Sequence, residues 1–333
     1  MNKNINIALV GLGQIGIYLY DQIQKKRKDI EIKTGKKINI VGISAKNINK
    51  KRRFKIDKKI FFKNPLDIIK KKNIDVLFEI IGQSDGISKR LVEEALSKKI
   101  NVITPNKALI AKHGDYLGSI AEKNKVNLEF EASVCGGVPI IRSIKEGLIA
   151  NKINRIYGIF NGTSNYILSS MDKMNKNFDE VLKKAKRLGY AESNPSADLN
   201  GDDVSAKLKI LSSLCFNSFL NNNVHVEGIK EINKIDIDNA NILGYKIKLL
   251  GVAEQIDNKI YQRVHPSLIK KNSYVAGVDG VLNAVLIEGS PVGQSVIQGE
   301  GAGPAATTSA LVSDISSILR GNVKFPFSIS NKE

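Results

Sequence analysis

The chain has 333 residues, 42% of them apolar, and a formal net charge of +18 at pH 7. Its length favours two domains over a single core. No stretch approaches 18 consecutive apolar residues and the first residues lead directly into a strand pattern, so we expect no membrane span and no secretory signal. The only two cysteines, Cys135 and Cys215, fit a reducing cytoplasm better than a disulfide framework.

The positive charge is distributed along the whole chain rather than gathered in one binding motif. Lysines alternate with Asn and Ile throughout, and the densest basic groups lie at 25–28, 50–53 and 70–72. Stacking on nucleic acid bases would favour aromatic residues among the basic ones, and Trp is absent. We therefore interpret the charge as a compositional bias and expect no nucleic-acid partner.

A glycine-rich turn follows the first predicted strand. Residues 5–10 are a short apolar run, and GLGQIG comes directly after them, before a helical run. In this context G-x-G-x-x-G typically binds a dinucleotide, because the glycines allow the pyrophosphate to approach free N–H groups at the helix start. A purely structural turn is the alternative. The residues expected to contact the cofactor here are Gly11, Gly13, Gln14, Ile15 and Gly16.

The second predicted strand, residues 37–44, ends where NAD-binding proteins usually offer an acid to the ribose. This chain instead has Ser44-Ala45-Lys46 and then the basic group at 50–53. Cations there suit a 2′-phosphate, so Lys46 favours NADP over NAD, although loop lysines are common in this sequence. Strand patterns at 76–81 and 101–104, separated by a helical run, predict a parallel, doubly wound sheet of the Rossmann type.

Polar residues follow two of these strands, at the edge where such sheets bind ligands. Residues 80–83 are expected to skirt the cofactor. The run Thr104-Pro105-Asn106-Lys107 places a lysine just beyond a strand end. Lys107 is therefore a candidate site residue, with one more surface lysine as the alternative.

Two loops in the next part of the chain have unusual backbone character. A predicted strand at 126–132 runs into 131–139, whose glycines and proline leave carbonyls exposed, either as a plain turn or as ligands for a hard cation. The strand 153–160 precedes the turn NGTSNYI, which opens a helix. Its N–H groups and the Thr163 and Ser164 hydroxyls could hold a carboxylate or the amino-acid backbone of a substrate.

The segment 185–207 has the highest density of chemically useful side chains. Asp202 is a plausible N-cap of a helix on which Asp203 and Lys207 form an i,i+4 pair, beside a loop with the carboxylates Glu192 and Asp198. This arrangement predicts a pocket. Such pairs are also common as solvated surface groups, which is the alternative interpretation.

The rest of the chain predicts strands and a final helix. Strand patterns occupy 249–255, 259–266 and 280–289, with a turn at 257–258 joining the first two. The glycine-rich turn 299–304 precedes a helix at 305–320, which we expect to return to the first domain. None of the three histidines has a second histidine at metal-ligand spacing, so no zinc site is predicted.

These motifs together resemble homoserine dehydrogenases. The G-x-G-x-x-G, PNK, NGTSNYIL, acidic 185–207 and GEGAG segments occur in that family's order. The resemblance implies NAD(P)-dependent interconversion of L-homoserine and L-aspartate 4-semialdehyde, in the biosynthesis of threonine, methionine and isoleucine. We assign the proton transfer to Lys207, place Lys107 opposite it, and expect Asp203 to orient Lys207.

The same resemblance implies further contacts. Glu192, Asp198 and Thr163 would bind the substrate, while Thr104, Lys107 and Gly301 would contact the cofactor. The family holds a structural sodium ion on main-chain oxygens and forms dimers through its second sheet, which here implies a homodimer. Many relatives carry a C-terminal ACT module for which this sequence has no room. The positions matching the sodium site are Glu131, Val134, Gly136 and Val138.

The predicted organisation is α/β throughout. We expect an NADP-binding Rossmann-type domain at 1–130, a mixed α+β substrate and dimerisation domain at 131–300, and a returning C-terminal helix at 301–333. Two rival functions remain open. One is an acylating semialdehyde dehydrogenase that uses Cys135 as nucleophile. The other is a non-enzymatic module that binds NADP.

Overall fold

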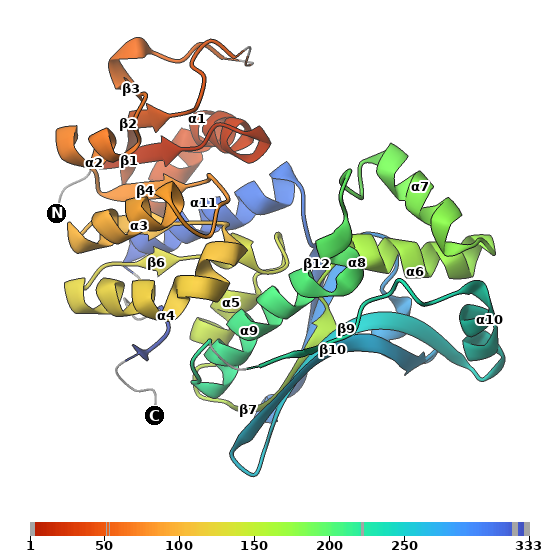
Figure 1. Cartoon of the computed structure of the whole chain (residues 1–333). Coiled ribbons are helices and arrows are strands. Elements are labelled where there is room, and N and C mark those ends of the chain that lie inside the picture. Colours follow the sequence, from red (N-terminus) through yellow and green to blue (C-terminus); the bar gives the residue numbers. More distant parts are fainter. Residues whose placement is uncertain (1–3, 51, 53, 221–222, 322–325, 330–333) are drawn as a thin grey trace. The chain divides into compact units, whose positions relative to one another are not determined.

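The computed structural model describes residues 4–50, 52, 54–220, 223–321 and 326–329. The chain divides into two compact units (Figure 1). Unit 1 consists of residues 1–137 and 303–333, and unit 2 of residues 138–302. Each unit is built around one six-stranded sheet.

The sheet of unit 1 is parallel, with strand order β3-β2-β1-β4-β5-β6. This confirms the doubly wound fold. The expected strand at 126–132 is mostly wrong, because the chain leaves the sheet after two residues. A 3₁₀ turn follows at Glu131–Ser133, where the Glu131 N–H donates to the buried carboxylate of Asp314 at 3.1 Å. The strands are β1 (Asn4–Val10), β2 (Lys37–Ser44), β3 (Phe61–Phe62), β4 (Val76–Glu79), β5 (Asn101–Ile103) and β6 (Leu128–Glu129).

Helices cover both faces of this sheet (Figure 1). Apolar side chains of α1 and α11, among them Leu19, Ile23 and Leu311, pack on one face against the strands. The helices α3 and α4 lie on the other face. The helices are α1 (Gln14–Thr34), η1 (Lys58–Ile60), α2 (Leu66–Lys71), α3 (Ile87–Ser97), α4 (Lys107–Asn124) and α11 (Pro304–Arg320).

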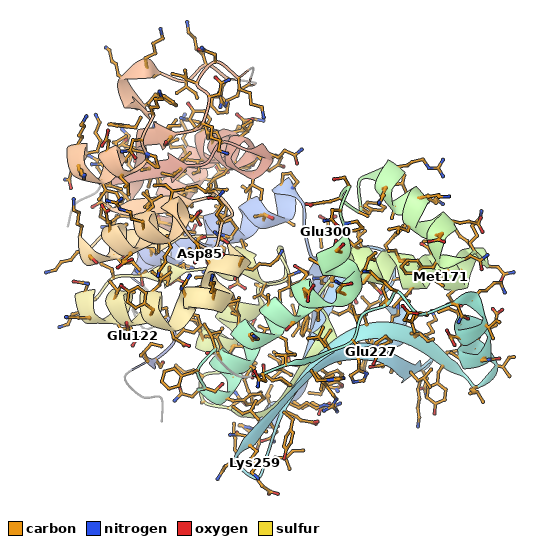
Figure 2. All side chains as sticks on the ribbon, in the orientation of Figure 1. Asp85, Glu122, Met171, Glu227, Lys259 and Glu300 are labelled. Carbon is orange, nitrogen blue, oxygen red and sulfur yellow. The ribbon has the colours of Figure 1, made fainter. Side chains whose placement is uncertain are left out.

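The sheet of unit 2 is mixed, with strand order β12-β11-β7-β9-β10-β8. Its neighbours are antiparallel except β8 and β10. The predicted hairpin turn is confirmed, since Asp257 and Asn258 have φ of 49° and 62° just before Lys259 (Figure 2). The strands are β7 (Lys152–Ile159), β8 (His225–Val226), β9 (Tyr245–Ile256), β10 (Lys259–Lys270), β11 (Leu282–Ser290) and β12 (Gly293–Glu300).

Helices α6, α9 and α10 pack against β9. Gly251 permits the approach of α9, because a Cβ there would lie 2.7 Å from the Phe160 ring and 3.0 Å from Val204. The expected N-cap Asp202 is wrong: Gly201, with φ of 89°, occupies the N-cap position and Asp202 is the first helical residue. The helices are α5 (Ile140–Arg142), η3 (Ser143–Gly147), α6 (Gly162–Met174), α7 (Phe178–Leu188), α8 (Ser196–Asn200), α9 (Asp202–Phe216), α10 (Lys234–Ile242) and η4 (Tyr274–Gly277).

Candidate active site

The glycine turn between β1 and α1 is held closed by contacts that only glycine permits. Gly11 has a φ of 105°, and a Cβ there would lie 2.2 Å from the Ile80 carbonyl oxygen. A Cβ on Gly16 would lie 2.0 Å from the Gly11 carbonyl oxygen. Above Gly13, in contrast, nothing lies within 4 Å of the Cβ position. Open space beside the N-terminus of α1 fits a pyrophosphate group.

A cleft of about 420 Å³ extends from this turn along the ends of β2 and β4. Four cations line it, namely Lys46, Lys50, Arg52 and Lys63. Arg52 donates to the carbonyl oxygens of three neighbouring loop residues, so it also shapes the loop. Lys51 and Arg53 lie outside the described residues. Gln14 and Ile15 are the first residues of α1 and do not line this cleft.

The segment after β5 leads into α4. Thr104 is fully buried and donates its hydroxyl to Glu79 at 2.6 Å. Asn106 caps α4, accepting a hydrogen bond from the Leu109 N–H at 3.1 Å. Lys107 is the first residue of that helix and is half-buried. The lysine therefore starts from a fixed backbone position at the ligand-binding edge of the sheet.

The pair Asp203 and Lys207 lies at the start of α9 in unit 2. The Lys207 ammonium is 2.8 Å from an Asp203 carboxylate oxygen, and the two side chains are only 9% and 5% exposed. Lys207 also donates to the Phe160 carbonyl oxygen at 2.6 Å. These contacts contradict the interpretation as a solvated surface pair. A buried ammonium between two oxygens is held in one geometry.

Asn161 connects this pair to a further carboxylate. Its amide nitrogen donates to Asp198 at 2.7 Å and to Asp203 at 2.9 Å. Its amide oxygen accepts from the Ser164 N–H at 2.7 Å and so caps α6. The sequence did not single out this residue for the site. An Asn directly before a helix start was the signal that could have identified it.

The other predicted substrate contacts are less closely grouped. Thr163 donates its hydroxyl to the Tyr190 carbonyl oxygen at 2.7 Å, which ties the start of α6 to the acidic loop. Glu192, on that loop, is exposed, and in the described part of the chain its carboxylate makes no hydrogen bond or ion pair. The structure thus brings together Asp198, Asp203 and Lys207 but leaves Glu192 facing solvent.

The loop expected to hold sodium reverses direction sharply. Cys135 and Gly136 have φ of 54° and 48°, and Glu131, Val134 and Cys135 are buried. Among the described residues, no group of three or more His, Cys, Asp or Glu side chains could hold a metal ion. A hard cation here would therefore need main-chain oxygens among its ligands. The last predicted ligand, Val138, is also buried and is the first residue of unit 2.

Gly301 follows β12 and is also required by packing. A Cβ at Gly301 would lie 2.2 Å from the side chain of Asn283. The proposed cofactor contact at this position thus involves a residue that cannot carry a side chain unless the buried Asn283 side chain moves.

A second buried charge group lies where β9 meets α6. The Lys248 side chain is 1% exposed and contacts Asp279 at 2.8 Å. Burial lowers the pKa of Lys248 below its usual value. Burial raises the pKa of Asp279, but hydrogen bonds from Lys248 and Lys173 outweigh this effect and leave it below its usual range.

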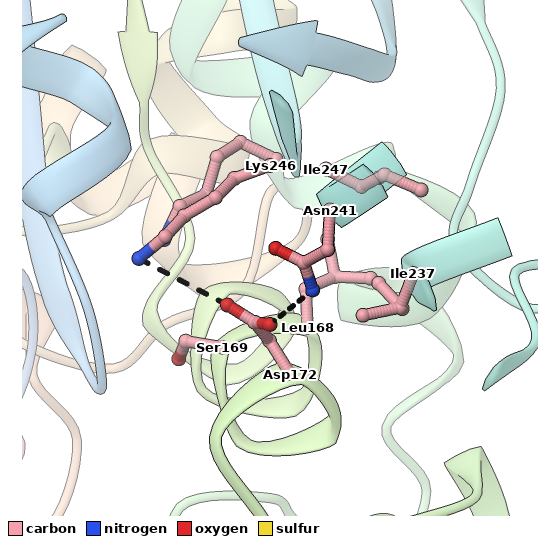
Figure 3. A pocket seen from close by; sticks show the side chains of 8 residues that line it. Leu168, Ser169, Asp172, Ile237, Asn241, Lys246 and Ile247 are labelled. Atoms are coloured by element: carbon pink, nitrogen blue, oxygen red, sulfur yellow. Dashed lines mark hydrogen bonds and ion pairs between the residues drawn. The ribbon is translucent and has the colours of Figure 1, made fainter. Parts of the chain in front are cut away.

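The pocket beside this group is small. Figure 3 shows Asp172 between Asn241 and Lys246, with nitrogen–oxygen distances of 2.6 Å and 3.9 Å. The pocket volume of about 10 Å³ is at the lower limit for a single water molecule. It cannot admit a substrate, so we treat the charge group as structural.

Across the described residues, no helix combines the length and apolar character needed to cross a bilayer.

Comparisons with known proteins cover both units. A family model for homoserine dehydrogenase matches residues 139–316, and one for the homoserine dehydrogenase NAD binding domain matches residues 11–131. The homoserine dehydrogenase of Neisseria gonorrhoeae is 40% identical over 96% of this chain and 73% of its own length. That of Helicobacter pylori is 39% identical over 96% of this chain and 75% of its own length.

Solved structures agree with these sequence matches. A homoserine dehydrogenase from Thiobacillus denitrificans has a TM-score of 0.93 at 36% identity, covering 99% of this chain and 78% of that one. One from S. aureus has a TM-score of 0.84 at 37% identity, covering 96% of this chain and 79% of that one. The alternative of an acylating dehydrogenase using Cys135 is not supported. The chain belongs to the homoserine dehydrogenase family.

Proposed function

We propose that Lys207 carries the proton in NADP-linked interconversion of L-homoserine and L-aspartate 4-semialdehyde. The observation that supports this is the buried ammonium of Lys207, fixed between Asp203 and the Phe160 carbonyl oxygen. A lysine held in this way can exchange a proton with an oxygen placed beside it. Asp203 orients Lys207, and Asn161 in turn holds Asp203.

The substrate amino group is a cation and needs carboxylates. Asp198 lies in the same hydrogen-bonded group as Asp203, so it is the nearer candidate, and Glu192 would need to turn inward from solvent. Thr163 positions the acidic loop through its bond to Tyr190. Lys107 is proposed to approach the reacting oxygen from unit 1, and its approach to Lys207 stays a prediction.

The residues proposed to hold the dinucleotide are those of the glycine turn and the cleft beside it. Gly11, Gly13 and Gly16 fit the pyrophosphate, because the first and last close the turn and Gly13 leaves space for a ligand. Lys46 and Lys63 add positive charge to the cleft, which favours NADP over NAD. The bound dinucleotide accepts or supplies the hydride. Thr104 and Gly301 are proposed to shape the cofactor's surroundings.

Three further features are proposed on the family relationship. A structural sodium ion would bind main-chain oxygens at 131–138, the loop in which Cys135 and Gly136 have positive φ. A homodimer would form through the sheet of unit 2, on which Tyr261 and Val296 are exposed apolar residues. A cytoplasmic location follows from the role in amino-acid biosynthesis.

The test compares two lysines on the same helix. Lys207→Ala should lower turnover of homoserine about 100- to 10,000-fold, since general acid–base groups contribute about 10²- to 10⁴-fold. Its affinity for NADPH, measured by fluorescence titration, should stay within about threefold of wild type. Lys209, a half-buried lysine two residues further on, provides the matched control, and Lys209→Ala should remain active. Retained turnover in Lys207→Ala would refute the proposal.

A separate variant tests the rejected cysteine chemistry. Cys135 is buried in a loop rather than exposed in a cleft. Cys135→Ser should therefore keep most of its turnover. A complete loss, with the melting temperature unchanged, would bring back the thiohemiacetal mechanism.

A further inference from the structure

Glu79, the last residue of β4, is a fully buried carboxylate with no part in the mechanism above. One of its oxygens accepts hydrogen bonds from the Ile81 N–H at 2.9 Å, the Gly82 N–H at 3.4 Å and the Ser88 hydroxyl at 2.9 Å. The other accepts from Thr104 at 2.6 Å and Asn106 at 3.4 Å. One side chain thus joins the segments after two neighbouring strands.

Both of these segments belong to the ligand-binding edge of the sheet. The first continues β4 into the cofactor cleft, which Ile80, Ile81 and Gln83 line. The second, residues 104–106, leads directly to Lys107. Asn106 strengthens the connection, because it also donates to the Gln83 carbonyl oxygen at 2.8 Å.

The chemistry of the group makes its geometry strict. A buried carboxylate without enough donors costs several kcal/mol, so the two segments must keep their positions while Glu79 is satisfied. Two of its donors are backbone N–H groups, which bind only if the chain keeps its turn at 81–82. The carboxylate therefore fixes the backbone of the cofactor cleft and the starting point of α4 relative to each other.

We propose that Glu79 is a positioning residue of this enzyme, which fixes the position of Lys107 relative to the cofactor-facing segment 80–83. This inference rests on the proposed roles of Lys107 and the cleft. It predicts that loss of the network misplaces Lys107 and lowers the rate of the chemical step. Substrate and cofactor binding should change little, because the groups that bind them remain.

The central test is a matched pair at Thr104, which leaves Glu79 itself intact. Thr104→Val keeps the shape but removes the hydroxyl donated to Glu79, and Thr104→Ser keeps the hydroxyl. Thr104→Val should lower kcat about 10- to 100-fold, the effect expected of a small misplacement. KM for homoserine and the Kd for NADPH should stay within about threefold, because the hydroxyl that is removed is buried against Glu79 and Thr104 does not line the cofactor cleft. Thr104→Ser should restore most of kcat.

Glu79→Gln should also lower kcat about 10- to 100-fold. The new amide NH₂ group would face hydrogen-bond donors, from which it cannot accept. The control for this variant is Glu122 near the far end of α4 (Figure 2), a half-buried carboxylate that accepts the N–H groups of Phe327 and Ile329. Glu122→Gln should lower the melting temperature without lowering kcat. If Glu79→Gln does not fold, the Thr104 pair decides alone.

Failure of the positioning role of Glu79 can be distinguished from failure of the proposed function. Wild-type kcat in Thr104→Val, or an equal loss in Thr104→Val and Thr104→Ser, overturns the positioning role. So does a loss that appears only in KM or in the NADPH Kd. Turnover that survives in Lys107→Ala would instead remove the proposed role of Lys107, whatever the Thr104 pair shows.

Discussion

Two buried carboxylates at the two candidate regions differ in the charge of their donors. Glu79 in unit 1 is 0% exposed and is held by five uncharged donors, two of them backbone N–H groups. Asp203 in unit 2 is 6% exposed and accepts from the Lys207 ammonium and the Asn161 amide. Both carboxylates have hydrogen-bond donors, but only Asp203 has a cationic donor, the Lys207 ammonium, that can give a proton to a substrate.

This difference separates positioning from chemistry. Backbone N–H groups and neutral hydroxyl or amide groups hold their protons near neutral pH, so the donors of Glu79 offer no proton to a substrate and their contacts fix structure. An ammonium beside a carboxylate can exchange its proton with a substrate oxygen. Burial alone therefore does not identify the reactive group. The kind of donor does not suffice either, since Lys248 and Asp279 form a buried ammonium–carboxylate pair beside a pocket too small for a substrate.

After the loss of Lys207 itself, the largest effect should follow from Asp203→Asn. The Lys207 ammonium would lose its nearest counter-charge while remaining buried, so we expect turnover to fall roughly 100- to 1,000-fold. Single-turnover kinetics with NADP and homoserine measure it. The loss should exceed that of Glu79→Gln. A smaller loss than in Glu79→Gln would break the comparison between the two carboxylates.

Asp279→Asn tests a buried ion pair outside the site. It leaves Lys248 without the carboxylate it contacts at 2.8 Å, and breaking such a pair costs about 3–5 kcal/mol. Urea denaturation at pH 7 should show this loss of unfolding free energy, while kcat of the folded variant stays within about twofold of wild type. A large loss of kcat in the folded variant would contradict the structural interpretation of this pair.

The stability difference between wild type and Asp279→Asn should depend on pH. The folded pKa of Asp279 is lowered, because the hydrogen bonds from Lys248 and Lys173 outweigh burial. Its stabilisation is therefore present above the unfolded pKa of about 4 and is lost as the pH falls through the lower folded value. The difference in stability between wild type and Asp279→Asn should shrink between pH 5 and pH 2. A difference that grows on acidification would reverse the assigned sign.

Asn161 allows the cap and the carboxylate contacts to be separated. The carboxylate of Asn161→Asp can still accept the Ser164 N–H. It cannot donate to Asp198 and Asp203, and it adds a like charge beside them. We therefore expect kcat/KM to fall about 10-fold, or 1.4 kcal/mol. Asn161→Ala should show a similar loss of kcat/KM and should lose about 1 kcal/mol of stability relative to wild type from the missing cap. Wild-type stability of Asn161→Ala, measured by thermal unfolding, would argue against the cap.

The smallest effect concerns cofactor choice. Lys46→Glu places an acid in the cleft and should shift the ratio of kcat/KM for NADP over NAD about 10-fold towards NAD. Lys37→Glu is the control, because Lys37 is exposed at the opposite end of the same strand. An unchanged ratio in Lys46→Glu would remove the assignment of the 2′-phosphate site.

Much of unit 1 could be predicted because its signals are local. The apolar run before GLGQIG and the steric needs of Gly11 and Gly16 depend on neighbouring residues, and the strand 37–44 was predicted with its observed bounds. Unit 2 was harder. The strand β12 was missed because its sequence GQSVIQGE is mostly polar and its two apolar residues are adjacent. The alternation in exposure along the strand therefore does not show in the sequence.

In the candidate site, too, local features could be predicted from the sequence and long-range contacts could not. The helical spacing of Asp203 and Lys207 could be read directly, since i,i+4 residues share a helix face whatever surrounds them. Their burial could not, because it depends on Phe160, which precedes Lys207 by 47 residues. Glu192, predicted from the same segment, faces solvent instead.

By itself, the sequence determined the glycine turn, the parallel α/β unit and the membership of a family, because these depend on short-range sterics and on the order of motifs. Only the tertiary structure decided which polar groups act together. Glu79 meets Thr104 across 25 residues, and Asn161 meets Asp203 across 42. Hydrogen bonds between such distant residues leave no periodic pattern in the chain, since they arise only when strands and helices bring the donors and acceptors within about 3 Å.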